Sequence, residues 1–163
     1  MLTLLLLICA AAAAPTLSAP DVKELLDTTY TDKSEKPVTL SDLAGKHIAL
    51  YFSASWCSGC REYTPKLVEL YNKLHASKDW EVIWVTHDET ETDADGYYKE
   101  MPWLRLPWSE VKERGIQMWE ELADVGYIPA LTMIGPDFKI INNQCTDNTI
   151  DNPGGFPWPL DLE

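Results

Sequence analysis

Short apolar runs with the length of strands recur through the middle and the C-terminal third of the chain. Two of them, 47–52 and 81–86, are apolar at most positions, which predicts strands buried on both faces of a sheet. Two more, 130–134 and 138–141, flank a Gly-Pro-Asp sequence that suits a hairpin turn. We therefore expect a pair of central strands and, further along the chain, an antiparallel hairpin.

A helical pattern lies between the two central runs. From 58 to 75, apolar residues recur every three or four positions, which predicts a helix with one buried face and a kink at Pro65. Further helices are expected over 94–101, where the acidic loop 88–93 supplies capping residues, and in the tract that starts at Ser109. A strand, a helix and a second strand in this order predict one parallel crossover.

The other segments have a less regular pattern. We expect 21–31 and 37–40 to be short strands or an irregular hairpin, and the proline-bounded segment 102–108 to be extended, of edge-strand type. The last twenty residues are polar and rich in proline, and 156–159 (Phe-Pro-Trp-Pro) is expected to fold back as a plug. Together these elements predict a single α/β domain with a central mixed β-sheet flanked by helices.

The first nineteen residues differ from the rest. The run from Leu2 to Ala14 is almost purely apolar, but it is too short to span a bilayer, which takes about 20 residues. It has the features of a secretory signal peptide, with cleavage points near 12–14 or at Ala19. We therefore predict a signal peptide over 1–19, a domain over 20–163 and secretion. The alternatives are an uncleaved anchor or a disordered leader, and a leader that is not a signal would leave the protein cytoplasmic.

The chain of 163 residues carries 26 acidic and 13 basic side chains, for a formal net charge of -13. This length suits one domain. So acidic a chain has no electrostatic basis for binding a phosphate backbone, which argues against a nucleic acid as partner. The charge instead favours solubility, and we expect a monomer without a stable membrane span.

Candidate redox chemistry is concentrated at 56–60, Trp-Cys-Ser-Gly-Cys. Cys57 and Cys60 follow a predicted strand and open a predicted helix, so the first sulfur lies at a helix N-terminus, which favours the reactive thiolate. Two thiols at this spacing can form a disulfide with each other or exchange it with another protein. The other cysteines, Cys9 and Cys145, are far apart, and one close pair favours redox chemistry over a disulfide scaffold.

A Cys-x-x-Cys sequence can also be half of a zinc site, which needs four ligands. The other candidates are Cys145 and three scattered histidines, His47, His75 and His87, none of them at ligand spacing. We therefore expect no metal and no organic cofactor, with the two thiols as the redox group. Cys145 is expected to be a partly buried small hydrophobe, the alternative being a thiol that pairs between chains or is capped.

The Cys-x-x-Cys ahead of a strand-helix-strand unit resembles the redox site of the thioredoxin fold. Pro65 lies five positions after Cys60, where that fold has its helix kink, and Ile128-Pro129 lies where it holds a cis-proline beside the disulfide. Other motifs resemble the tryparedoxin/nucleoredoxin branch of the superfamily: Phe52-Ser53-Ala54-Ser55-Trp56-Cys57, Cys60-Arg61, Tyr63-Thr64-Pro65, Tyr97-Tyr98, Met101-Pro102-Trp103-Leu104 and Phe156-Pro157-Trp158. The resemblance extends over about residues 25–160 and implies a thioredoxin-like fold.

The chemistry of the pair suggests its roles. Cys57 would attack a substrate disulfide to form a mixed disulfide, and Cys60, one turn further on and more buried, would resolve it. Trp56 would shield the pair, and Pro129 would leave the neighbouring backbone free to pair with an extended substrate. The supporting, substrate-facing residues are expected to be Trp56, Ser58, Gly59, Ile128 and Pro129.

Two positions depart from the patterns of these families. The tryparedoxin branch usually has Pro-Pro between its cysteines, whereas this chain has Ser58-Gly59, and glycine destabilises a helix by about 1 kcal/mol relative to alanine. We therefore expect a less rigid loop and a different reduction potential. Thioredoxins have a buried Asp six residues before the first cysteine; here, as in the tryparedoxin branch, that position is Tyr51, so another group or water must move the proton.

We therefore predict a thiol-disulfide oxidoreductase that works as a protein-disulfide reductase on disulfide-containing proteins or small thiols. A secreted oxidase or isomerase would differ from it in reduction potential. The other alternative is a non-catalytic thioredoxin-fold binding module, but the presence of both cysteines and of Trp56 argues against it.

Overall fold

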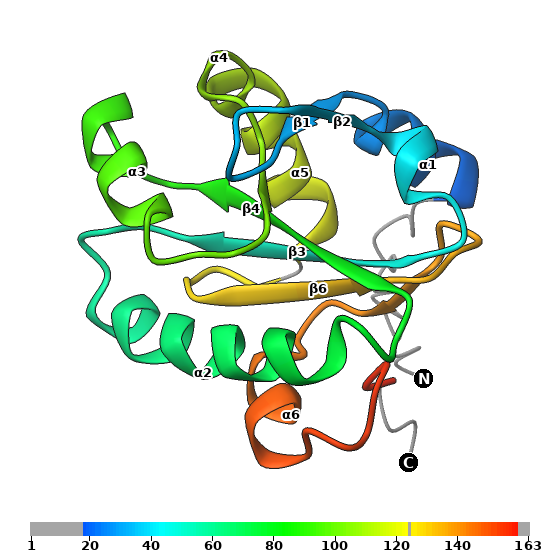
Figure 1. The fold of residues 1–163 in the computed structure, drawn as a ribbon. Helices are drawn as coiled ribbons and strands as arrows, with labels where there is room; N and C mark the ends of the chain where they lie inside the picture. The colour runs from blue at the N-terminus through cyan, green and yellow to red at the C-terminus, as the bar shows by residue number, and fades with distance from the viewer. Residues whose placement is uncertain (1–17, 124, 160–163) are drawn as a thin grey trace, which may run out of the picture.

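The computed structural model describes residues 18–123 and 125–159, which build a seven-stranded sheet (Figure 1). Its strands are β1 (Thr29–Thr31), β2 (Pro37–Thr39), β3 (His47–Ser53), β4 (Trp80–Thr86), β5 (Leu104–Arg105), β6 (Ala130–Ile134) and β7 (Ile140–Asn142). Their order is β2-β1-β5-β4-β3-β6-β7. The pairs β3/β4 and β4/β5 are parallel, and the other neighbours are antiparallel. The predicted mixed sheet, with its parallel crossover and C-terminal hairpin, is thus confirmed.

Helices flank this sheet, as Figure 1 shows, with α2 and α6 together below it in that view. The helices are α1 (Ala19–Leu26), α2 (Ser58–Leu74), α3 (Glu91–Tyr98), α4 (Trp108–Glu110), α5 (Ile116–Leu122) and α6 (Thr146–Asp151), with the short turns η1 (Leu40–Leu43) and η2 (Val111–Gly115). Helix α2 runs through Pro65 and keeps the extent expected from its apolar stripe. It connects β3 to β4, so its first turn lies at the end of the central strand.

The central strand β3 is buried on both faces, because its side chains alternate between two apolar clusters. Ile48, Leu50 and Phe52 belong to the cluster that includes residues of α1 and α5. Ala49 and Tyr51 belong to the cluster that includes residues of α2 and α3. This arrangement confirms the prediction for 47–52 and fixes the end of β3, where the Cys-x-x-Cys segment begins.

The N-terminal part of the predicted strand 21–31 is wrong, because the chain forms α1 before the short strand β1. Ser18 donates its backbone N–H and its hydroxyl to the Asp21 carboxylate, at 3.0 and 2.6 Å, in a capping box. Val22, Leu25 and Leu26 then share one helical face and are buried in the core. The sequence signal was Ser-x-x-Asp ahead of this spacing.

The middle of the chain differs from expectation at two places. The helix predicted over 94–101 begins at Glu91, because Thr90 caps it by accepting the N–H of Asp93 at 3.2 Å. The extended segment 102–108 does contribute β5, but β5 lies between β1 and β4 and is not an edge strand. The helical tract that follows starts at α4 and is divided by the π-helical turn η2 before α5 begins.

The C-terminal segment folds back as a plug, as predicted. Trp158 is buried, its indole N–H donates to the Asn152 carbonyl at 2.8 Å, and its ring packs against Trp80 and Phe156 at centroid distances of 5.8 and 5.2 Å. The same segment forms α6, which no apolar stripe indicated. There the buried Thr149 hydroxyl hydrogen-bonds with the hydroxyl of Tyr63 from α2. Strand β7 is shorter than the predicted 138–141 and covers 140–142.

The predicted signal peptide over 1–19 lies almost entirely outside the described residues, which begin at Ser18. Within the described part of the chain, no helix has the length and apolar character needed to cross a membrane.

Replacement of Glu81 by Gln is expected to stabilise the fold at neutral pH. Glu81 is buried in β4, and its carboxylate accepts the Tyr71 hydroxyl at 2.8 Å and the Val82 N–H at 3.0 Å. Burial raises the pKa of this carboxyl, with the two hydrogen bonds opposing it in part. Because the folded-state pKa lies above the unfolded one, the stability that this group contributes is greatest in acid and declines as pH rises through the folded pKa.

Gln keeps an acceptor oxygen without the charge, so at pH 7 we expect Glu81→Gln to raise Tm by about 2–4 °C, which corresponds to about 1 kcal/mol in a chain of this size. The advantage should disappear near pH 4, where Glu81 is protonated. Circular-dichroism melts at both pH values provide the measurement. Glu69→Gln is the control: Glu69 is exposed on α2 and its pKa is lowered by Lys73, so this variant should gain nothing at pH 7. An equal gain at both pH values would contradict the charge-burial explanation.

Candidate functional site

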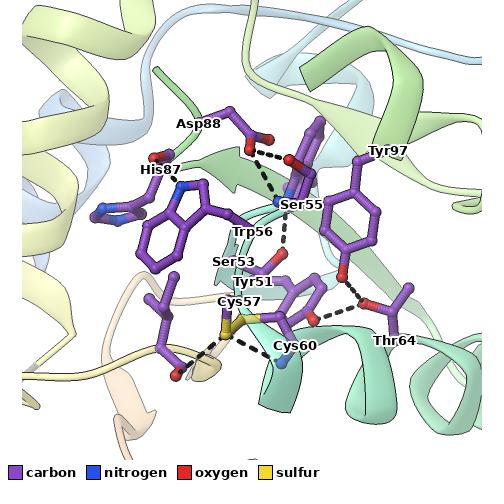
Figure 2. Close-up of a disulfide and its surroundings, with 12 residues drawn as sticks. Tyr51, Ser53, Ser55, Trp56, Cys57, Cys60, Thr64, His87, Asp88 and Tyr97 are labelled. Carbon is purple, nitrogen blue, oxygen red and sulfur yellow. Dashed lines mark hydrogen bonds between the residues drawn. A yellow bond between two sulfur atoms is a disulfide. The ribbon is translucent and has the colours of Figure 1, made fainter. Parts of the chain in front are cut away.

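Cys57 and Cys60 form a disulfide at the first turn of α2 (Figure 2). Their Cα atoms are 5.2 Å apart. Cys57 is the N-cap residue of α2, and its Sγ accepts the backbone N–H of Cys60 at 3.1 Å. Cys57 is 9% exposed, whereas Cys60 is fully buried. An incoming sulfur can therefore reach Cys57 far more easily than Cys60.

Cys57 borders a groove of about 550 Å³. The residues that line it come from the Cys-x-x-Cys segment, the end of β4, α5 and the loop before β6: Trp56, Cys57, Ser58, Gly59, His87, Trp119, Gly126, Tyr127 and Ile128. Five of the seven predicted site residues line this groove, whereas Cys60 and Pro129 do not. Sequence reasoning did not identify His87, Trp119 or Tyr127 as groove residues, because their proximity to Cys57 comes from the pairing of β4 and β6 with β3 and from the packing of α5 on β3.

The segment Ile128-Pro129 lies directly against the disulfide, and its peptide bond is cis. The carbonyl oxygen of Ile128 is 3.6 Å from Cys57 Sγ, so it can accept a hydrogen bond when that sulfur is a thiol. The Ile128 side chain packs on the small cluster of Ala54, Cys57 and Cys60. This placement matches the expectation that the resemblance gave for these two residues.

Gly59 also faces this segment. A Cβ atom built on Gly59 would be 3.4 Å from Pro129 Cδ, which is ordinary van der Waals contact. Ser58 and Gly59 form the first turn of α2, where the backbone N–H groups have no partner within the helix. Glycine is therefore not required here by a close approach, and the Ser-Gly sequence leaves the turn free of the rigidity that proline would impose.

A buried carboxylate holds the segment before Cys57. Asp88 is 6% exposed, and its Oδ1 accepts the N–H and the hydroxyl of Ser55 at 2.9 and 2.6 Å. Its Oδ2 accepts the Thr86 hydroxyl at 2.8 Å. The sequence analysis placed Asp88 in an acidic loop that supplies capping residues, but in the fold this carboxylate joins the end of β4 to the turn that carries Trp56. No local sequence signal distinguished this carboxylate from its acidic neighbours.

The exposed Trp56 side chain has a fixed orientation. Its indole is 65% exposed, and its N–H donates to the His87 carbonyl at 3.3 Å, an interaction drawn in Figure 2. Tyr127, in the loop between α5 and β6, is also largely exposed. Exposed aromatic side chains at a groove are available for contact with a partner. They leave an apolar surface beside Cys57 on an otherwise acidic chain.

Tyr51, at the position of the thioredoxin aspartate, belongs to a buried hydroxyl network. Its hydroxyl hydrogen-bonds with Thr64 Oγ1 at 2.8 Å, and Thr64 Oγ1 with the Tyr97 hydroxyl at 2.6 Å. Burial raises the pKa of Tyr51 and of Tyr97 above the ordinary value. Both phenols therefore stay neutral, so they can orient hydrogen bonds beneath α2 but cannot replace a carboxylate as a charged base.

Cys145 is fully buried, rather than partly, and is not disulfide-bonded. Its thiol donates to the Leu131 carbonyl at 3.0 Å, and burial raises its pKa to about 12. A thiol in this environment packs as a small hydrophobe, and its burial contradicts the alternative of pairing between chains. Among the described residues, no group of three or more His, Cys, Asp or Glu side chains is arranged to hold a metal ion.

Comparison with known proteins places the chain in a family. Residues 45–140 match the family model described as thioredoxin-like. The tryparedoxin of Trypanosoma brucei is 44% identical over 128 residues, which cover 75% of this chain and 85% of that protein. Human nucleoredoxin is 36% identical over 121 residues; the match covers 72% of this chain but only 27% of the nucleoredoxin.

Solved structures agree with the sequence matches. A tryparedoxin from Trypanosoma brucei has a TM-score of 0.75 at 39% identity, with 82% of this chain and 93% of that one covered. A tryparedoxin II complexed with glutathionylspermidine has a TM-score of 0.76 at 32% identity, with 87% and 99% covered. With its fold, its Cys57–Cys60 disulfide and these matches, the chain belongs to the thioredoxin-like family, in the branch of the tryparedoxins and nucleoredoxins.

Proposed function

We propose that this chain is a protein-disulfide reductase that uses Cys57 and Cys60 as its redox pair. The observation that carries the proposal is the unequal placement of the two sulfurs: Cys57 borders the groove, and Cys60 lies fully buried behind it. A two-step thiol-disulfide exchange requires a nucleophilic thiol that contacts the substrate and a second thiol that the substrate does not reach. Family membership supports the same chemistry.

In the reduced protein, the N-terminus of α2 and the Cys60 N–H favour the Cys57 thiolate. This thiolate attacks one sulfur of the substrate disulfide; the bond between the substrate sulfurs breaks, and the second sulfur leaves as a thiolate that takes a proton from water. Cys60 then loses its proton to water, its thiolate attacks Cys57 Sγ, and the first substrate sulfur leaves as a thiolate that takes up a proton. Two electrons pass to the substrate, and the Cys57–Cys60 disulfide is the product.

The groove favours two classes of substrate. An extended protein segment can lie along Ile128 and contact Trp56 and Tyr127, both of which are largely exposed beside Cys57. A small thiol can enter the same groove, and the related tryparedoxin II complex with glutathionylspermidine supports this class. With a net charge of -13, the chain would attract a cationic thiol more strongly than an anionic one. We expect the protein to act on these substrates as a monomer.

The direction of electron flow depends on the reduction potential of the Cys57–Cys60 pair. The Ser58-Gly59 turn between the two cysteines influences this potential. Oxidase and reductase dithiols span about 150 mV, and about 30 mV corresponds to a tenfold change in the glutathione equilibrium of a two-electron couple. Equilibration of the Cys57–Cys60 pair in a glutathione redox buffer measures this potential. A value as oxidising as that of a disulfide oxidase would replace reduction by oxidation or isomerisation in this proposal.

The activity itself is tested by the reduction of insulin with dithiothreitol as the electron source. Wild-type protein should accelerate insulin precipitation, and the double variant with Cys57→Ser and Cys60→Ser should leave it at the background rate. Equal rates for the two proteins would favour a binding module of thioredoxin fold over an enzyme.

We also propose that the apolar leader directs export, with cleavage before Ser18. Ser18 caps α1, and Val22, Leu25 and Leu26 of that helix lie in the core, so cleavage at 12–14 would leave the domain intact. Cleavage at Ala19 would remove the cap. Mass spectrometry of protein collected from the medium should find an N-terminus between 13 and 18. Retention of Met1 on cell-associated protein would contradict export.

A further inference from the structure

His87 occupies a fixed position at the wall of the groove. Its backbone N–H donates to the Ser53 carbonyl at 2.9 Å. Its carbonyl accepts the Trp56 indole N–H at 3.3 Å, as Figure 2 shows. Its ring meets Trp119 edge-on at a centroid distance of 4.8 Å and Phe52 at 6.2 Å. These contacts from β3, α5 and the turn before Cys57 hold the imidazole where the groove begins.

The His87 imidazole lies between two cavities and lines both of them. It lines the groove that Cys57 borders and also a cavity of about 170 Å³, lined by Thr86, Asp88, Val111, Lys112, Gly115 and Ile116 as well. Within the described part of the chain, neither ring nitrogen takes part in a hydrogen bond. A half-buried imidazole with free nitrogens can therefore exchange a proton or a hydrogen bond with a molecule in the groove.

Burial, and not a neighbouring charge, keeps the His87 imidazole neutral at physiological pH. Burial lowers the pKa of its imidazole, and the neighbouring Asp88 carboxylate opposes this shift only in part. Lys112 of η2 faces the smaller cavity, and the ionisable groups of the groove are Cys57 and the Tyr127 phenol. Asp88 is already committed to Ser55 and Thr86, so His87 is the groove-lining base that is free to accept a proton.

We propose that His87 is the general base that deprotonates the donor thiol when the Cys57–Cys60 disulfide is reduced. The proton of the donor R–SH passes to the imidazole, and the resulting thiolate attacks Cys57 Sγ. The Cys57–Cys60 bond breaks, Cys60 leaves as a thiolate and takes up a proton, and the donor remains joined to Cys57 as a mixed disulfide. A second donor thiol then completes the reduction as R–S–S–R. This role rests on the proposed oxidoreductase function and deepens it.

The size of the expected effect follows from the ionisation of ordinary thiols. A free cysteine, with a pKa of about 8.5, is roughly 3% thiolate at pH 7, so a base can accelerate its attack by about thirtyfold at most. Mercaptoethanol is a weaker acid than free cysteine, so its ceiling is higher. An aromatic thiol such as thiophenol is largely ionised at pH 7 and needs no base. A substitution that removes only proton transfer should therefore slow reduction by the alkyl thiol and not by thiophenol, whereas any other effect of the substitution should change both rates.

The test is the rate at which mercaptoethanol and thiophenol reduce the oxidised protein, followed by tryptophan fluorescence in a stopped-flow instrument. His87→Gln should slow mercaptoethanol about tenfold and change the thiophenol rate by less than about twofold. His87→Phe keeps an aromatic ring against Trp119 and Phe52 without a nitrogen, and it should behave in the same way. His75→Gln is the control, because the His75 ring stacks on Tyr71 outside the groove and should affect neither donor.

The pH profile gives a second readout. From pH 6 to 8, the mercaptoethanol rate of the His87 variants should rise close to tenfold per unit, following the thiolate, whereas the wild-type rate should rise more gently. Equal slowing of both donors, or no slowing of mercaptoethanol, would overturn the role of His87. The insulin assay compares the wild type with the variant that lacks both Cys57 and Cys60, so the reductase proposal and the His87 proposal can fail separately.

Discussion

Cys60→Ser is expected to accumulate stable mixed disulfides with substrate proteins, whereas Cys57→Ser should capture none. The structure gives the reason: Cys57 borders the groove with its sulfur facing Ile128, and Cys60 is fully buried beneath it. Without Cys60, nothing displaces the substrate sulfur that Cys57 has captured. Both variants should lose insulin reduction down to the background rate of the reductant.

The measurement is a non-reducing gel of each variant after incubation with a protein disulfide, with the adducts released by dithiothreitol. Cys145→Ser is the matched control, since the Cys145 thiol is buried and its raised pKa of about 12 keeps it protonated. That variant should retain wild-type activity and form no adducts. Equal trapping by Cys57→Ser and Cys60→Ser would refute the assignment of the two roles.

Asp88→Ala is expected to cause the largest loss of stability among single substitutions near the groove. It would remove the acceptor for the Ser55 N–H, the Ser55 hydroxyl and the Thr86 hydroxyl; Thr86 is buried and Ser55 is half-buried. Buried donors without partners cost about 1–3 kcal/mol each before any relaxation, so a net loss of about 2–4 kcal/mol is expected. In a chain of this size this corresponds to a fall in Tm of about 5–15 °C.

Because Ser55 directly precedes Trp56 and Cys57, the loss of this anchor should also lower the insulin-reduction rate at temperatures where the variant is still folded. Thermal melts and the insulin assay provide the two readouts. Glu89→Ala is the control: it removes the next carboxylate in the chain, which is exposed. A variant of Asp88 with unchanged Tm would show that water replaces the carboxylate without cost.

Elements whose signal is local were predicted from the sequence. Strand β3 and helix α2 were found within a residue of their ends, because a continuous apolar run and a three-to-four-residue period each identify one kind of element. The hairpin of β6 and β7 followed from its Gly-Pro-Asp turn. The sequence patterns do not predict α1 or α6. Most of α1 lies in a segment, 21–31, whose pattern predicts short strands, and the polar sequence of α6 is helical only where Thr149 packs on α2.

The sequence by itself determined the redox pair, its place at the start of α2 and the family, because a Cys-x-x-Cys between strand and helix acts through neighbours in the chain. Only the tertiary structure decided what surrounds that pair. Asp88 is buried and hydrogen-bonded, although its acidic neighbours in the sequence are exposed. His87 and Tyr127 line the same groove as Cys57, although they lie 30 and 70 positions further along the chain. Such proximity comes from the parallel pairing of β3 with β4 and the antiparallel pairing of β3 with β6, which bring three strand ends together. Pairing between distant strands depends on the packing of the whole core, and no local pattern of residues specifies it.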